Sequence, residues 1–144
     1  SFDVLVTRNV TWNLHDPRKA YGHWTRVLAP GGLLLNFDAN WYRYLWDDQA
    51  QEGHARDREN LKTSDVRDEN AGTDVDAMEA IARQTPLSRQ ARPQWDLSLL
   101  AELGIQASAD EHIWRQVWTR EERINNASTP MFLVEGRKAK LSES

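Results

Sequence analysis

Two short apolar runs, separated by a segment of helical length, constrain the fold of this chain more than any other feature. Residues 2–7 are rich in valine, residues 33–38 are rich in leucine, and each run is nearly continuous. Such runs are typical of parallel strands that are buried on both faces. Because parallel neighbours need a crossover connection, usually a helix, the pattern predicts one strand–helix–strand unit within the first 40 residues.

The segment between the two runs carries the signals that begin and end a helix. Asp16 can accept hydrogen bonds from the free backbone donors of the first turn, and Pro17 has no donor to lose there. Apolar residues then recur at helical spacing and form one stripe: Ala20, Tyr21, Trp24, Val27 and Leu28. We expect Pro30-Gly31-Gly32 to stop the helix and turn the chain into the second strand.

Residues 41–93 have a different character, because they are polar and densely charged with both signs mixed. Weak apolar patterning favours one helix over about 46–62 and another that begins near Thr73. An uninterrupted loop of this length is uncommon in a compact domain. We therefore expect residues 41–93 to form a helical insertion or lid.

Regular patterns return in the last third of the chain. Four leucines mark a short helix that Gly104 is well placed to end. A strand is expected over about 106–118. Thr119 and Glu122 then have the spacing of a capping box, which predicts a short helix. Residues 131–135 form the last expected strand.

The composition disfavours nucleic-acid binding and excludes some other kinds of site. The 144 residues have a formal net charge of −4, so the chain has no excess of basic residues with which to grip nucleic acid. The absence of cysteine excludes disulfides and thiolate zinc sites and fits a cytoplasmic protein. His23, His54 and His112 are interpreted as structural, because their spacings and neighbours make no metal-ligand set. No apolar run approaches the length needed to cross a membrane.

The residues at the junctions of these elements resemble a known family. Residues 2–9 place an aspartate near the start of a strand and polar residues at its end. Residues 26–32 read Arg-Val-Leu-Ala-Pro-Gly-Gly, and residues 100–105 and 131–134 look like a penultimate helix and turn and a last strand. Together they resemble the C-terminal portion of a class I S-adenosylmethionine-dependent methyltransferase of the type 11 kind, which has lysine where this chain has Ala29.

This resemblance implies a fold class and a function. The fold would be α/β, a partial Rossmann-like methyltransferase sheet with strands four to seven, the last of them antiparallel. Residues 1–40 and 94–140 would form the C-terminal half of that domain, and residues 41–93 would be inserted in it. The implied activity is methyl transfer from the cofactor S-adenosylmethionine to a small-molecule acceptor.

One feature of the family is missing from the sequence. The resemblance implies a glycine-rich turn that approaches the cofactor closely, yet the only adjacent glycines, Gly31 and Gly32, precede a strand instead of following one. The chain also opens directly into a strand, without methionine. We therefore expect a truncated fragment that binds the methyl donor weakly and is inactive alone.

The candidate site residues follow the expected strands, since ligands of open α/β sheets bind beyond the carboxyl ends. By position and by the resemblance, Arg8, Asn9 and Trp12 are the candidates for cofactor contacts. Equally, Arg8 could pair with a surface acid and Trp12 could simply pack. His15, in the turn that follows, is a weak candidate for a general base, although a lone loop histidine is more often solvated.

A second group of candidates follows the second strand, where an acceptor would approach. This group comprises Asp38, Asn40, Trp41 and Tyr42. Aromatic rings can stack on a planar or cationic group. The alternative is a strand end that is capped by core aromatics.

Two other functions are compatible with the sequence. The strand–helix–strand unit is equally compatible with another Rossmann-like nucleotide-cofactor enzyme, because the fold does not fix the function. The chain could also be a non-catalytic interaction module. The strand at residues 2–7 would have one unpaired edge, which can pair with the same strand of a second copy. We therefore expect a homodimer through this edge.

Overall fold

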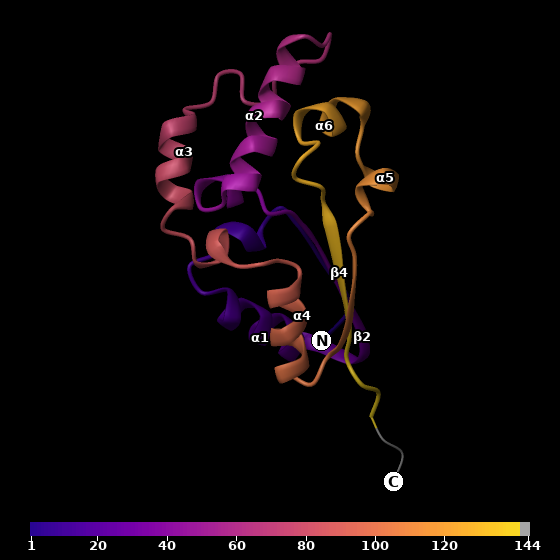
Figure 1. Ribbon diagram of the computed structural model, residues 1–144. Helices are drawn as coiled ribbons and strands as arrows, with labels where there is room; N and C mark the ends of the chain where they lie inside the picture. The colour runs from indigo at the N-terminus through magenta and orange to yellow at the C-terminus, as the bar shows by residue number, and fades with distance from the viewer. Residues whose placement is uncertain (142–144) are drawn as a thin grey trace.

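The computed structural model describes residues 1–141, which form a four-stranded mixed sheet with helices on one face and a helical region at one end (Figure 1). The strand order is β1 (Phe2–Arg8), β2 (Leu28–Asp38), β4 (Phe132–Arg137) and β3 (Gln106–Asp110). β1 pairs parallel with β2, whereas β4 lies antiparallel to both β2 and β3. The expected parallel pair and antiparallel last strand are therefore confirmed, and with them the partial Rossmann-like fold class.

The core lies between the sheet and the two helices α1 (Pro17–Val27) and α4 (Gln94–Glu102), which Figure 1 shows on the same side of the strands. Asp16 caps α1 by accepting a hydrogen bond from the Lys19 backbone at 3.0 Å, as the sequence predicts. The buried cluster between these layers joins residues from both helices and from the strands: Tyr21, Leu28, Leu34, Leu99, Leu100, Ile105, Phe132 and Val134.

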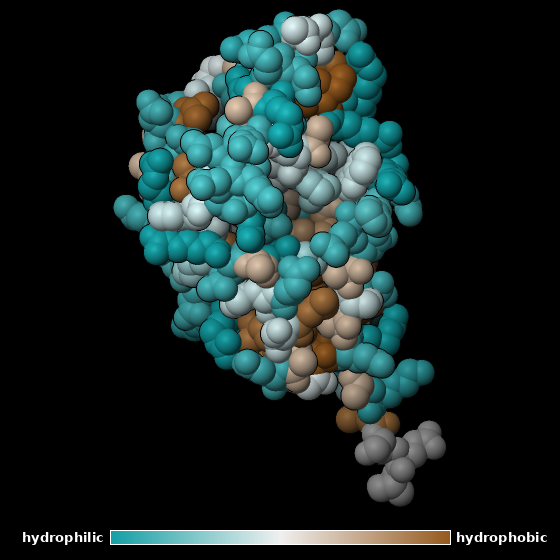
Figure 2. Space-filling model, viewed as in Figure 1, coloured by the Kyte–Doolittle hydropathy of each residue, from teal (hydrophilic) through white to brown (hydrophobic). Residues whose placement is uncertain are grey.

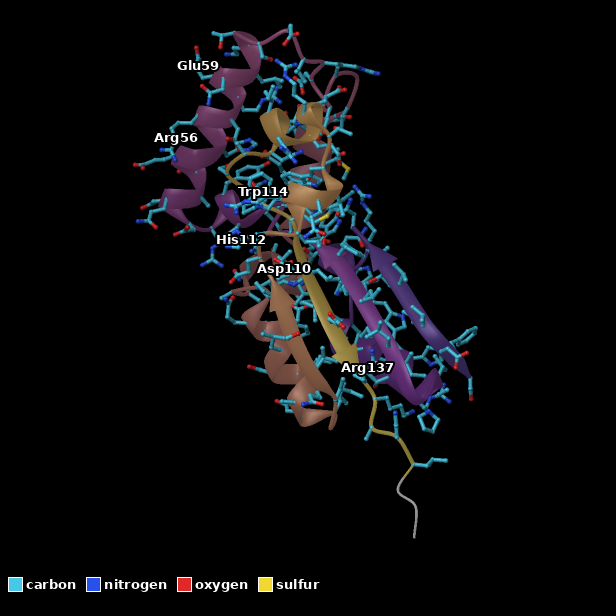
Figure 3. All side chains as sticks on the ribbon, turned by 90° about the vertical axis from the view of Figure 1, so that its right-hand side faces the viewer. Arg56, Glu59, Asp110, His112, Trp114 and Arg137 are labelled. Carbon is cyan, nitrogen blue, oxygen red and sulfur yellow. The ribbon has the colours of Figure 1, made fainter. Side chains whose placement is uncertain are left out.

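The prediction that β1 is buried on both faces is wrong. Phe2, Val4 and Val6 are 58%, 52% and 57% exposed. β1 is one of the two edge strands of the sheet, and its alternate side chains point to the face opposite α1 and α4. Figure 3 shows this second face, where within residues 1–141 no helix lies over the strands. The apolar run therefore marks a strand with one covered face.

The Pro30-Gly31-Gly32 segment lies inside β2 instead of between helix and strand. Phe2 pairs with Leu28 but Val4 pairs with Leu33, so β2 carries extra residues there and bulges. Gly31 has a φ of +78°, and a Cβ on Gly32 would lie 2.7 Å from the carbonyl oxygen of Ala29. Glycine is required because this bulge brings two backbone segments together.

Replacing Gly32 with alanine is expected to lower the free energy of unfolding by about 1–3 kcal/mol, because the added methyl group overlaps backbone atoms that cannot move independently. Gly22 is the matched control, since its Cβ would meet nothing within 4 Å and it lies inside α1. Gly22→Ala should stabilise the chain by up to about 1 kcal/mol. Urea unfolding of both variants measures the difference, and equal effects would contradict this account of the bulge.

Residues 41–93 fold into helices, as expected, beyond the carboxyl ends of β1 and β2 (Figure 1). The two helices are α2 (Asp48–Lys62) and α3 (Val75–Ala82), capped by the side chains of Asp47 and Asp74. Three 3-10 turns complete this end of the molecule: η1 (Thr11–Asn13), η2 (Arg43–Leu45) and η3 (Pro86–Arg89). Figure 2 shows a largely hydrophilic surface over this region, in keeping with its composition. Its role as an insertion or lid stays a prediction.

The strand that the sequence predicts over about 106–118 ends at Asp110. The Asp110 carboxylate accepts a hydrogen bond from the His112 backbone at 2.8 Å, which turns the chain out of the sheet. The short helix α5 (Trp114–Val117) then replaces the second half of the expected strand, as Figure 3 shows. The predicted capping box is confirmed at the start of α6 (Arg120–Asn125). No helix in the described part of the chain is both long and apolar enough to cross a bilayer.

Candidate functional site

The turn after β1 is held against the end of β2 by backbone contacts. The Asn9 backbone donates to the carbonyl oxygen of Phe37 at 2.9 Å, and Asn9 has a φ of +58°. Trp12 then donates from its indole Nε1 to the carbonyl oxygen of Asn9 at 3.1 Å. The left-handed backbone conformation of Asn9 reverses the direction of the chain. Trp12 therefore lies beside Tyr42, the residue that follows β2 by four positions, with ring centroids 5.2 Å apart.

A cavity of about 250 Å³ opens at this place, between the two strand ends and the helical region. Four residues that the sequence predicts for the site line it together, namely Asn9, Trp12, Trp41 and Tyr42. The other lining residues come from 44–78 and from the end of α6 and the segment after it: Tyr44, His54, Asp57, Arg58, Glu69, Asn70, Thr73, Val75, Met78, Asn125, Asn126 and Thr129. The cavity therefore joins three parts of the chain that are far apart in sequence.

Aromatic rings form a continuous row along the cavity. Trp12 contacts Tyr42, whose ring centroid lies 5.8 Å from that of Tyr44. Tyr44 in turn stacks on His54 at 3.8 Å with an interplanar angle of 4°. The Tyr44 hydroxyl donates to Glu79 at 2.6 Å, which fixes the orientation of this ring. All four residues of the row line the cavity, so they offer aromatic surface to whatever binds there.

His54 is one of the lining residues that the sequence did not identify, because its spacing and neighbours indicated a structural histidine. Partial burial, and secondarily the positive charge of Arg58, lower the pKa of His54 below its usual 6.5. The imidazole is therefore neutral at pH 7 and free to accept a proton. Asp57, three residues on along α2, is 5% exposed and accepts hydrogen bonds from the Ser128 backbone and hydroxyl at 2.9 and 2.5 Å.

Asp38 lies in a buried ionic network instead of in the cavity. It is fully buried and accepts a hydrogen bond at 2.7 Å from Arg92, which also donates to Asp96 at 2.9 and 2.8 Å. Tyr21 donates to the same Asp96 and accepts a hydrogen bond from Asn36 at 2.6 Å. Burial raises the pKa of Asp38 against the opposing effect of Arg92. This network ties α1 and α4 to the end of β2.

The structure separates the remaining candidates from the cavity. Arg8 pairs with Glu122 at 3.2 Å, which is the surface alternative that the sequence left open. Asn40 donates to the carbonyl oxygen of Arg92 at 2.9 Å and lines a second, smaller cavity of about 140 Å³. His15 is exposed and is not one of the residues that line either cavity. Within residues 1–141, no group of three or more His, Asp or Glu side chains is placed to hold a metal ion.

Comparison with known proteins identifies the fold. Residues 1–36 match a family described as a methyltransferase domain. A solved structure of the CurJ carbon methyltransferase is similar over 97% of this chain and 30% of its own, with 15% identity and a TM-score of 0.51. The arsenic(III) S-adenosylmethionine methyltransferase CrArsM from Chlamydomonas reinhardtii is similar over 98% of this chain and 38% of its own, with 17% identity and a TM-score of 0.42.

The match over residues 1–36 confirms the resemblance to class I methyltransferases in sequence. The CurJ structure confirms it in fold. The chain spans less than two-fifths of the length of either solved structure. No curated protein matches the chain.

Proposed function

We propose that this chain supplies the acceptor-binding side of an S-adenosylmethionine-dependent methyltransferase that acts on a small molecule. The observation that carries the proposal is the cavity beyond the carboxyl ends of β1 and β2, where open α/β sheets bind their ligands. It is lined by aromatic and polar residues, and such a site can hold a nucleophile in fixed alignment and exclude water. These are the main requirements of a displacement at an already activated carbon.

S-adenosylmethionine would supply that activated methyl group. Asn9 and Trp12 fit a contact with it, because both line the cavity at the end of β1. Arg8 fits less well, because its guanidinium is paired with Glu122. Since the sequence contains no glycine-rich turn after a strand, we expect the 144 residues alone to bind the methyl donor weakly and to transfer no methyl group.

His54 takes over the proton-accepting role that the sequence suggested for His15. Its neutral imidazole lines the cavity, whereas His15 lies outside it. None of the hydrogen bonds found among residues 1–141 involves the side-chain nitrogens of His54, so the unprotonated ring nitrogen is free to receive a proton from an acceptor. Stacking on Tyr44 holds the ring in place.

The test is a methyl-transfer assay on the longest protein that the gene encodes, with labelled S-adenosylmethionine and a panel of small acceptors. We expect transfer to at least one acceptor, and none with the 144-residue chain alone. Transfer by the 144 residues alone would contradict the claim that they are an incomplete enzyme. No transfer by the longest protein to any small molecule would contradict the proposed function itself.

We also propose that the free edge of β1 pairs with β1 of a second copy, which would suit an interaction module as well as an enzyme. Among the described residues β1 pairs with β2 alone, and Phe2, Val4 and Val6 are exposed beside that edge. Light scattering should give twice the chain mass of 16.6 kDa. Val6→Lys should weaken the dimer, whereas Ile81→Lys on α3 should not. A clean monomer of the unaltered chain at high concentration would contradict the pairing.

A further inference from the structure

The charges around the cavity, with its aromatic row, restrict what it can bind. Two carboxylates line it, those of Asp57 and Glu69, and the one guanidinium among its described lining residues is that of Arg58. Arg58 donates to both carboxylate oxygens of Asp68 at 2.9 and 2.5 Å, which neutralises its charge. The cavity is therefore left with an excess of negative charge.

The two lining carboxylates differ in the number of hydrogen bonds that they already accept. Asp57 is held by two hydrogen bonds from Ser128. Glu69 accepts one from the Asn126 side chain, through one carboxylate oxygen, at 3.0 Å. Burial raises the pKa of Glu69, so its charge is incompletely solvated. A ligand that brings a positive charge would compensate it.

We propose that the acceptor held in this cavity is a small amine that binds as its ammonium cation, against the rings of Trp12, Tyr42 and Trp41 and beside Glu69. The ammonium nitrogen regains the lone pair that attacks the methyl group when its proton passes to His54, which lines the same cavity. Ring faces attract cations through their quadrupole, and a carboxylate within reach adds a direct charge interaction. An anionic acceptor finds no unpaired cation among the described lining residues. That this amine is the methyl acceptor rests on the proposed function, whereas its binding in the cavity does not.

The test uses three probes of one shape on the 144-residue chain: 2-phenylethylamine, 2-phenylethanol and 3-phenylpropionate, at pH 7. Binding is followed by tryptophan fluorescence and by the NMR shifts of the indole N–H groups. The ammonium probe should bind about tenfold more tightly than the alcohol, and the carboxylate more weakly than either. Equal binding of ammonium and alcohol, or tighter binding of the carboxylate, would overturn the inference.

A matched pair of variants locates the charge. Glu69→Gln should weaken binding of the ammonium probe about twofold to fivefold and leave the alcohol unchanged. Glu59→Gln is the control, because Glu59 lies on the outer side of α2, where Figure 3 shows it pointing away from the strands. Trp12→Leu should weaken ammonium binding independently of Glu69. If Glu69→Gln and Glu59→Gln bind the ammonium probe equally, the proposed orientation is wrong.

Failure of this inference and failure of the proposed function give different results. If the chain discriminates the ammonium probe but the longest protein transfers no methyl group, the cation site stands and the enzyme does not. If methyl transfer occurs but the probes are not discriminated by charge, the function stands and the amine acceptor is excluded.

Discussion

Replacing Arg92 with methionine lowers the free energy of unfolding by about 3–5 kcal/mol, because it leaves two buried carboxylates without their cation. Arg92 contacts Asp38 on one side and Asp96 on the other, and all three side chains are almost fully buried. Methionine fills much of the space but donates no hydrogen bond. Urea unfolding monitored by tryptophan fluorescence measures the loss.

The control for this prediction is the same substitution at an exposed ion pair. Arg18 pairs with Glu102 at 2.7 Å, but both side chains are more than half exposed. Arg18→Met should therefore change stability by no more than about 1 kcal/mol. A loss at Arg92 as small as the loss at Arg18 would mean that the buried network does not hold α4 and β2 together.

Replacing His54 with glutamine lowers kcat for methyl transfer by about 100-fold in the longest protein that the gene encodes, because the acceptor loses its proton-accepting partner. His15→Gln, the same change at an exposed site, should leave kcat within about twofold. Thermal unfolding of both variants separates a loss of chemistry from a loss of folding. A larger effect at His15 than at His54 would restore the assignment that the sequence alone suggested.

The pH profile gives a second readout for His54. Its pKa is lowered from 6.5, so the imidazole becomes protonated, and unable to accept a proton, only at pH values below 6.5. The kcat of the unaltered enzyme should therefore be constant near pH 7 and fall as the pH drops through that lowered pKa. The kcat of the His54→Gln variant should not fall over this acidic pH range. If kcat still falls in the variant, the fall is caused by the titration of another group and not of His54.

The elements that define the fold were predictable because each carries a local signal. The apolar runs of β1 and β2, and Asp16-Pro17 at the start of α1, specify a strand–helix–strand unit without any long-range information. The end of β3 was not predictable in this way. The turn that ends β3 depends on one side-chain contact of Asp110. An aspartate within a candidate strand is only a weak indication that the strand ends there.

Part of the cavity was predictable, for a physical reason. Residues that follow β1 and β2 must meet, since parallel strands end at the same edge of a sheet, and Asn9, Trp12, Trp41 and Tyr42 do. His54 was hidden because α2 buries an atypical face that is formed by Gly53, Asp57 and Leu61. A Cβ on Gly53 would lie 2.8 Å from Ser128, a contact between residues 75 positions apart that no local pattern reveals.

The burial of Asp38 shows the same limit. Its position at the end of β2 fits a substrate contact, and the i,i+4 spacing of Arg92 and Asp96 indicates a helical ion pair. Nothing in the sequence joins Asp38 to Arg92, which is 54 residues away. The structure places Asp38 in a buried network at the strand end, outside the lining of the cavity.

Calorimetric titration of the longest encoded protein with S-adenosylhomocysteine, and separately with NAD⁺, tests the central claim most directly. The account predicts saturable one-to-one binding of S-adenosylhomocysteine and none of NAD⁺. Binding of NAD⁺ alone would show that this sheet serves another Rossmann-like enzyme and would contradict the assignment to methyl transfer.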